Sequence, residues 1–201
     1  MTVTHLTPAD YTTSRWSGGA TTELLVRPRG AVYSQRDFLF RVSSATVELP
    51  ESTFTALPDY DRLIATLEGE IDLVHDGGAP IHLRPYEVHA FDGGSATRSF
   101  GRCRDFNLML RKGRAAGSLV PLTAGTDPQR VPLTGEDSTA LLYCAKGSCT
   151  VGTPDGAYDL SCGESLLLED VQAQAIILQG SARLMLARMR EMPESGSARP
   201  R

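Results

Sequence analysis

The sequence lacks several features that would place it in a specialised class. Its longest apolar runs fall well short of the roughly 20 residues that a membrane span needs. The formal net charge of −4 leaves no basic surplus for nucleic acid or an anionic membrane. The first ten residues, MTVTHLTPAD, have neither the basic nor the apolar region of a signal peptide. We therefore expect a cytoplasmic protein without a membrane or direct nucleic-acid partner.

Cysteine and histidine are also scarce, with four of each. No two cysteines form a C-x-x-C pair, and a chain of 201 residues can bury a core without disulfides. We expect reduced and largely buried thiols. A redox or metal pair of Cys144 and Cys149 is the alternative. The histidines are scattered singly and form no metal-binding motif.

Helical periodicity is almost absent, and short alternating segments take its place. Residues 37–49, 62–74 and 105–111 alternate apolar and polar side chains, which is typical of strands. Glycine-containing turns such as DGG, FDGG and TPDG separate such segments and provide positions that tolerate positive φ. Many strands without intervening helices predict an all-β sandwich or barrel.

The two halves of the chain also repeat one another. Gly69 and Gly147 are 78 residues apart, Glu87 and Glu164 are 77 apart, and the leucines at 108 and 184 are 76 apart. This order favours an internal duplication. We expect an N-terminal barrel over residues 1–112, a linker or crossover over 113–138, a shorter second half over 139–190 and a mobile tail over 191–201. The order of strands, glycine turn and L-x-P-x-E resembles the cupins, so the predicted fold is two tandem cupin-like jelly-roll barrels.

The metal ligands of cupins are missing. Metal-binding cupins carry two histidines and a glutamate before the glycine turn, whereas FTALPDYDRLIATLEGE contains no histidine. His89 lies one residue from the expected position of a later ligand, and we expect it to point to the opposite face. His75 and His82 flank a turn and are interpreted as surface residues. The sequence predicts no metal and no cofactor.

Three strands carry a polar stripe. Asp105, Asn107 and Met109 share one face of their strand, Arg41 and Ser43 share a face of another, and Arg62 begins a third. Such stripes can face water, as in many antiparallel sheets. If they instead line the barrel interior, two guanidinium groups opposite one acid and one amide provide surplus donors that suit a planar carboxylate.

Six motifs in order identify a resemblance. WSGGATTE, FRVSSA, FTALPDYDR, LEGE, FDGG and DFNLM together resemble the HutD/Ves family over residues 14–112. The resemblance implies a metal-free bicupin. One branch is associated with histidine utilisation and is thought to sense a small carboxylate intermediate such as formiminoglutamate, formylglutamate or urocanate. The Ves branch is linked to stress and has no agreed chemistry. The chain departs from the family at Leu57-Pro58-Asp59 and Phe91-Asp92-Gly93-Gly94, which concerns the rim and the ligand rather than the fold.

The resemblance also implies a set of ligand-binding residues: Trp16, Thr22, Glu23, Arg41, Ser43, Arg62, Asp105 and Asn107. Trp16 would cover the mouth of the barrel, and Gly18 and Gly19 would let the backbone approach a ligand. In the alternative, Trp16 is a core residue and Glu23 is a solvated edge charge.

Three functions follow from these observations. The first is a sensor or regulator that binds a small carboxylate, clamped by Arg41 and Arg62 and oriented by Asn107 and Ser43. The second is a metal-independent isomerase or epimerase that uses Asp105 or Glu23 as a general base. The third is an interaction module that pairs into a homodimer through sheet edges.

Overall fold

The computed structural model describes residues 1–134, 138–171 and 174–193. Within these ranges the chain forms seventeen strands and two 3-10 turns, η1 (Pro8–Asp10) and η2 (Tyr33–Gln35). The described residues contain no helix with the length and hydropathy to cross a membrane. The all-β prediction is confirmed.

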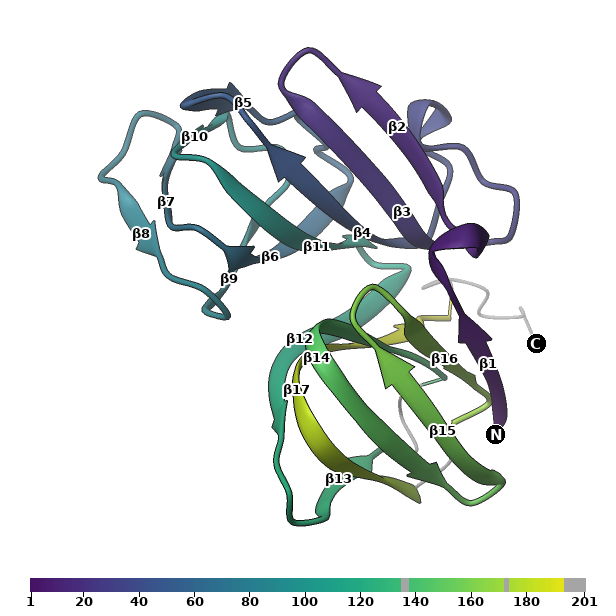
Figure 1. The fold of residues 1–201 in the computed structure, drawn as a ribbon. Helices are drawn as coiled ribbons and strands as arrows, with labels where there is room; N and C mark the ends of the chain where they lie inside the picture. Colours follow the sequence, from purple (N-terminus) through teal and green to yellow (C-terminus); the bar gives the residue numbers. More distant parts are fainter. Residues whose placement is uncertain (135–137, 172–173, 194–201) are drawn as a thin grey trace, which may run out of the picture.

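The N-terminal half consists of two sheets that face each other (Figure 1). The larger has six strands in the order β2 (Thr12–Trp16), β3 (Gly19–Arg27), β4 (Phe40–Val47), β11 (Cys103–Arg111), β6 (Tyr60–Glu68) and β9 (Val88–Asp92). The smaller has four strands in the order β5 (Glu51–Thr53), β10 (Thr97–Phe100), β7 (Ile71–His75) and β8 (Ile81–Leu83).

The C-terminal half is one curled sheet of seven strands. Its main order is β1 (Thr2–Leu6), β16 (Ser165–Glu169), β14 (Thr139–Thr153), β17 (Gln174–Glu191) and β12 (Ala115–Ala124). Two further strands, β13 (Gln129–Leu133) and β15 (Gly156–Ser161), pair with β17 and β14 respectively.

The boundary between the halves differs from the expected one. Residues 113–138 do not form a linker, because β12 and β13 both pair with β17 and alternate buried with exposed residues. Strand β1, expected in the N-terminal barrel, pairs with β16 instead. The chain therefore crosses between the halves twice, between β1 and β2 and in the short turn after β11. Residues 135–137, and 194–201 of the expected tail, lie outside the described residues.

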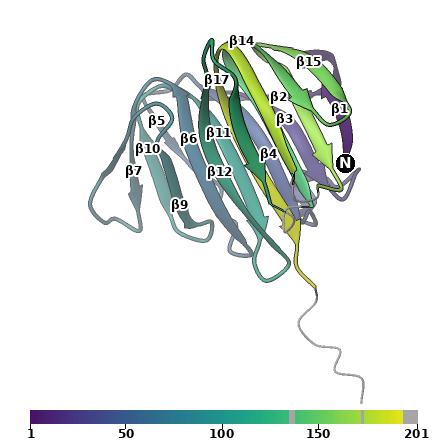
Figure 2. The ribbon, with the colours of Figure 1, turned by 90° about the horizontal axis from the view of Figure 1, so that it is seen from below.

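The halves pack through the outer face of the six-stranded sheet. Phe106, Leu108 and Leu110 on β11 are buried in a cluster with Leu141 and Met185 of the C-terminal sheet. Strand β12 contacts β11, β6 and β9, and Figure 2 shows these strands running next to one another. Because successive strand residues point to opposite faces, this packing turns the polar residues of β11 into the N-terminal barrel. The polar stripe therefore lines the interior and does not face water.

The repeated positions have the same local geometry in both halves. Gly69 and Gly147 have φ angles of 75° and 76°. The Glu87 carboxylate accepts a hydrogen bond from the Arg84 backbone N–H at 3.0 Å, and Glu164 accepts one from the Ser161 N–H at 2.9 Å. The interior of the C-terminal half differs from that of the N-terminal half, since it is filled by an apolar cluster.

Candidate functional site

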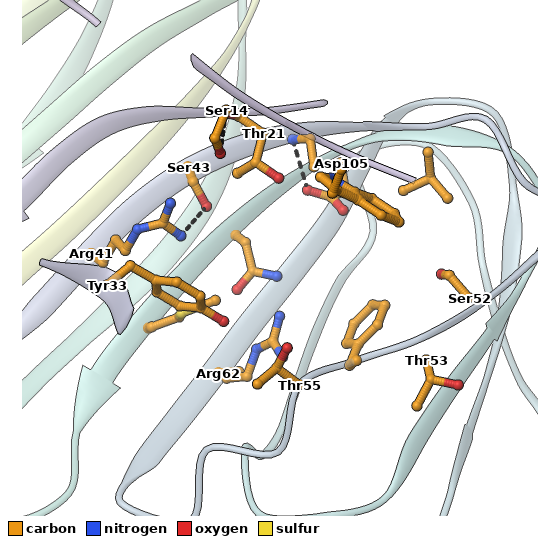
Figure 3. A pocket seen from close by; sticks show the side chains of 16 residues that line it. Ser14, Thr21, Tyr33, Arg41, Ser43, Ser52, Thr53, Thr55, Arg62 and Asp105 are labelled. Carbon is orange, nitrogen blue, oxygen red and sulfur yellow. Dashed lines mark hydrogen bonds between the residues drawn. The ribbon is translucent and has the colours of Figure 1, made fainter. Parts of the chain in front are cut away.

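A cavity of about 400 Å³ lies between the two sheets of the N-terminal half (Figure 3). Strands β3, β4, β6 and β11 provide its floor, and β2, β5 and the loop after β5 provide its rim. Six of the eight predicted residues line it: Trp16, Arg41, Ser43, Arg62, Asp105 and Asn107.

Strand register arranges the floor in transverse rows. In one row, Ser14, Thr21, Ala45 and Asp105 are paired across β2, β3, β4 and β11. Two residues further along the strands, Glu23, Ser43 and Asn107 form the next row. Another two residues on, Arg41, Met109 and Arg62 form a third. The cavity therefore has an acidic end and a basic end, separated along the strand direction.

Arg41 is already neutralised within the protein. Its Nε donates to Glu23 Oε2 at 2.6 Å, and Nη1 donates to Ser43 Oγ at 3.1 Å. Its guanidinium also lies 4.6 Å from the centre of the Tyr33 ring. Glu23 and Ser43 therefore hold Arg41 in place, and of the two Ser43 also lines the cavity.

Arg62 has no such partner. It is 6% exposed, and no hydrogen bond or salt bridge joins it to the described part of the chain. Its guanidinium lies 4.8 and 5.2 Å from the centres of the Phe54 and Phe91 rings, which contact each other with their centres 6.2 Å apart. Burial lowers the pKa of Arg62 from its ordinary value. Asp105 and Arg41 act on it electrostatically, but neither is in ion-pair contact with it, so the buried cation is a site for an anion from outside the chain.

Asp105 and Asn107 provide acceptors on the same floor. The Asp105 carboxylate accepts one hydrogen bond, from the Ala45 N–H to Oδ1 at 3.2 Å. Burial raises the pKa of Asp105 to about 6, although the Ala45 N–H and the two arginines act in the opposite direction. Asn107 Oδ1 is buried without a hydrogen-bond partner in the described residues. The floor therefore offers acceptors as well as a cation.

Trp16 lies at the mouth and not in the core. It is 41% exposed and lines the cavity. Its ring packs against Gly18, where an added Cβ would lie 2.1 Å from the indole. The alternative of Trp16 as a core residue is wrong, because an exposed edge strand carries it.

Thr22 does not line the cavity. Its hydroxyl hydrogen-bonds to Thr13 at 2.9 Å on the other face of the sheet. Neighbouring strand residues point to opposite faces, so Thr22 and Glu23 cannot both point inward. Thr21 lines the cavity instead.

Several lining residues were missed by the sequence analysis. Thr21 could have been found by extending the alternation of its strand by two residues from Glu23. Met109 was placed on the polar face of its strand but was not counted among the ligand-binding residues. Tyr33 comes from a 3-10 turn, and Phe54 and Thr55 come from a loop. In such segments the sequence has no regular apolar–polar alternation from which the direction of a side chain could be predicted.

The prediction for His89 is wrong. His89 is paired with Ile64, and Phe91 with Arg62, so His89 lies on the interior face. Its Nε2 is 3.0 Å from Nε2 of His75, whose Nδ1 is 2.8 Å from Thr97 Oγ1. His75 is therefore half-buried and not a surface residue, whereas His82 is exposed. Among the described residues no group of three or more histidine, cysteine or acidic side chains could hold a metal ion.

Comparison with known proteins places the chain in a family. The family described as HutD matches residues 8–186. A conserved protein of unknown function from Pseudomonas aeruginosa PAO1 is 25% identical, with a TM-score of 0.82 over 94% of this chain and 99% of that one. HutD from Pseudomonas fluorescens SBW25 is 23% identical, with a TM-score of 0.77 over 94% and 99%.

A more distant structure shares the fold alone. A cupin 2 conserved barrel domain protein from Leptotrichia buccalis is 10% identical, with a TM-score of 0.56 over 89% of this chain and 92% of that one. No curated protein matches the sequence. The all-β, cupin-like architecture and the match over most of the length lead to one conclusion: the chain belongs to the HutD family.

Proposed function

We propose that this HutD-family protein binds a small carboxylate in its N-terminal cavity, with Arg62 as the main anchor. The observation that carries the proposal is the buried Arg62 guanidinium, which has no ion-pair partner in the described residues. Burying an uncompensated charge costs several kcal/mol, and a bound anion would offset that cost. The planar guanidinium can donate two parallel hydrogen bonds to a carboxylate.

The remaining lining residues support a small polar ligand. Asn107 Oδ1 would accept from an N–H or O–H of the ligand, and the hydroxyls of Ser14, Thr21 and Thr55 lie around the same space. A volume of about 400 Å³ falls at the lower end of small-molecule sites.

The biological role that we propose is sensing in histidine utilisation. The basis is membership of the HutD family together with a cavity suited to a carboxylate. Formiminoglutamate, formylglutamate and urocanate all carry such a group. Binding without turnover would report the level of the intermediate.

The test is calorimetry with these three compounds, supported by fluorescence of Trp16, the only tryptophan. We expect at least one of them to bind, and Arg62→Met to remove that binding. Arg98→Met is the matched control, because Arg98 pairs with the exposed Glu51 outside the cavity. Equal affinity in wild type and Arg62→Met, or no binding of any carboxylate, would refute the proposal.

One observation favours an enzyme as the second candidate. A buried carboxyl whose pKa is raised to about 6 is suited to act as a general base, and Asp105 lies in the cavity. Glu23, the other candidate base, is bound to Arg41. Product formation seen by NMR with any of the three compounds, and its loss in Asp105→Asn, would replace the sensor with an enzyme.

A further inference from the structure

The acidic end of the cavity contains a second feature that a simple carboxylate leaves unused. Asp105 is 6% exposed, and its only carboxylate hydrogen bond in the described residues is the one to Ala45. No arginine of the described part of the chain lies within salt-bridge distance of it, although Arg41 and Arg62 line the same cavity. A buried carboxylate that is neither paired nor fully hydrogen-bonded is as unusual as the unpaired Arg62.

The strand register keeps these two groups apart. Asp105 is paired with Ala45, and Arg41 lies four residues before Ala45 on the same strand. At about 3.3 Å per residue, the two rows are about 13 Å apart at the backbone. Figure 3 shows Asp105 with Ser14 and Thr21 at one side of the cavity, and Arg41, Tyr33 and Arg62 at the other.

The side chains around Asp105 also favour a cation. Trp16 lines the cavity with it, on the strand that carries Ser14. Indole is the most favourable aromatic face for a cation. Ser14 and Thr21 add hydroxyl oxygens in the same row as Asp105.

We propose that the cavity is dipolar and binds a ligand with a carboxylate at Arg62 and a protonated nitrogen, such as an ammonium or amidinium group, at Asp105 beside Trp16. This inference rests on the proposed carboxylate site and adds the chemistry of the other end. Asn107 Oδ1, in the row between the two charges, accepts a hydrogen bond from the middle of the ligand.

The alternative ligand is a dicarboxylate bound with Asp105 protonated, and pH separates the two. The charged groups that act on Asp105 are Arg62 on β6 and Arg41 on β4, and Arg41 is itself paired with Glu23 on β3; the Cys103 thiol lies two residues away on the same strand as Asp105. Burial raises the pKa of Asp105 to about 6. A cationic end therefore binds more tightly as the pH rises through this value, and a second carboxylate binds more tightly as the pH falls.

The experiment compares three probes of equal chain length: 5-aminopentanoate, pentanoate and glutarate. Calorimetry and Trp16 fluorescence are measured at pH 7.5 and pH 5. At pH 7.5 we expect 5-aminopentanoate to bind at least about tenfold more tightly than either of the others, because its ammonium group alone can donate a charge-assisted hydrogen bond to the buried Asp105 carboxylate. That preference should shrink at pH 5.

Two variants locate the nitrogen. Asp105→Asn keeps the acceptor for Ala45 but removes the charge, so it should abolish the preference for 5-aminopentanoate. Trp16→Leu lies at the exposed mouth, where the fold tolerates a change, and should weaken that preference by several-fold.

The outcomes separate the two proposals. Tighter binding of glutarate than of 5-aminopentanoate at pH 7.5, still dependent on Arg62, overturns the dipolar cavity and leaves the carboxylate site intact. An unchanged ammonium preference in both variants also overturns it. If no probe binds, or if binding does not depend on Arg62, the dipolar cavity is refuted. The carboxylate site is refuted as well if formiminoglutamate, formylglutamate and urocanate also show no binding that depends on Arg62.

Discussion

Replacing Arg62 by methionine should move stability and binding in opposite directions. Methionine has a similar length and is apolar, so it can pack against the Phe54 and Phe91 rings without a charge. In the ligand-free protein the change removes a buried cation that no described residue neutralises. It also removes two cation–π contacts, each worth about 0.5–2 kcal/mol.

The desolvation term is the larger one. Removing an ion from water costs several kcal/mol even after relaxation, and replacing buried charges by apolar residues of similar volume often stabilises a protein by about 1–4 kcal/mol. We expect Arg62→Met to raise the free energy of unfolding by about 1–3 kcal/mol. For a chain of this size that corresponds to a melting temperature several degrees higher, at roughly 2–4 °C per kcal/mol.

Binding should change in the other direction. Truncating one partner of a buried charge pair costs about 2–5 kcal/mol, which is roughly a 30- to 5,000-fold loss of affinity. Urea denaturation without ligand and calorimetry with ligand measure the two effects.

Arg41→Met is the informative comparison. It leaves Glu23 without its partner, and since the Glu23 side chain is 24% exposed we expect the free energy of unfolding to fall by only about 1 kcal/mol.

The prediction for Arg62→Met is refuted if this variant folds normally and yet unfolds at a lower urea concentration than wild type.

Three further predictions test other parts of the structure. In urea denaturation, Gly147→Ala should lower the free energy of unfolding by at least about 2 kcal/mol more than Gly113→Ala does. Both glycines have positive φ, but at Gly147 the new Cβ would lie 2.0 Å from the Ser181 carbonyl oxygen, whereas at Gly113 it would meet no atom within 4 Å. Similar losses would contradict the close approach. Burial lowers the pKa of His75 from 6.5, so at low pH the unfolded chain binds more protons than the folded one, and the free energy of unfolding should fall as the pH drops below 6.5. NMR titration should show a lowered pKa for His75 and a raised pKa for His82, which hydrogen-bonds to Asp72. A His75 titration above 6.5 would contradict this. A thiol reagent should modify Cys162 quickly and the buried cysteines only after unfolding, as measured by absorbance of the released thiolate; rapid reaction of all four would be inconsistent with their burial.

Much of the fold could be predicted because strand alternation is a local signal. Residues 105–111 alternate in the sequence, and the apolar members Phe106, Leu108 and Leu110 are buried. The repeated glycines could be paired because each needs a positive φ at the same point of a hairpin. The linker prediction was wrong because Gly, Pro and Ala in 113–138 obscured the alternation of β12 and β13.

The candidate site could be predicted only in part. The alternation of side chains along one strand places Asp105 and Asn107 on the same face, but it does not say whether that face meets water or a cavity. The alternation also gives the wrong face when the inward-pointing residues of a strand are misidentified by one position, as happened for Thr22 and for His89. Residues such as Phe54 and Tyr33 reach the cavity from irregular segments and leave no pattern in the sequence.

By itself the sequence determined the all-β class, the repeated hairpins and the residue types available for a site, since each depends on neighbours along the chain. Only the tertiary structure decided that the C-terminal sheet covers the apolar face of β11 and thereby turns its polar face inward. It also decided which arginine is paired, because strand register brings Glu23 to Arg41, whereas Arg62 contacts the rings of Phe54 and Phe91 and has no ion-pair partner in the described residues. Pairing between strands that are distant in the sequence depends on non-local packing, so it cannot be predicted from local composition.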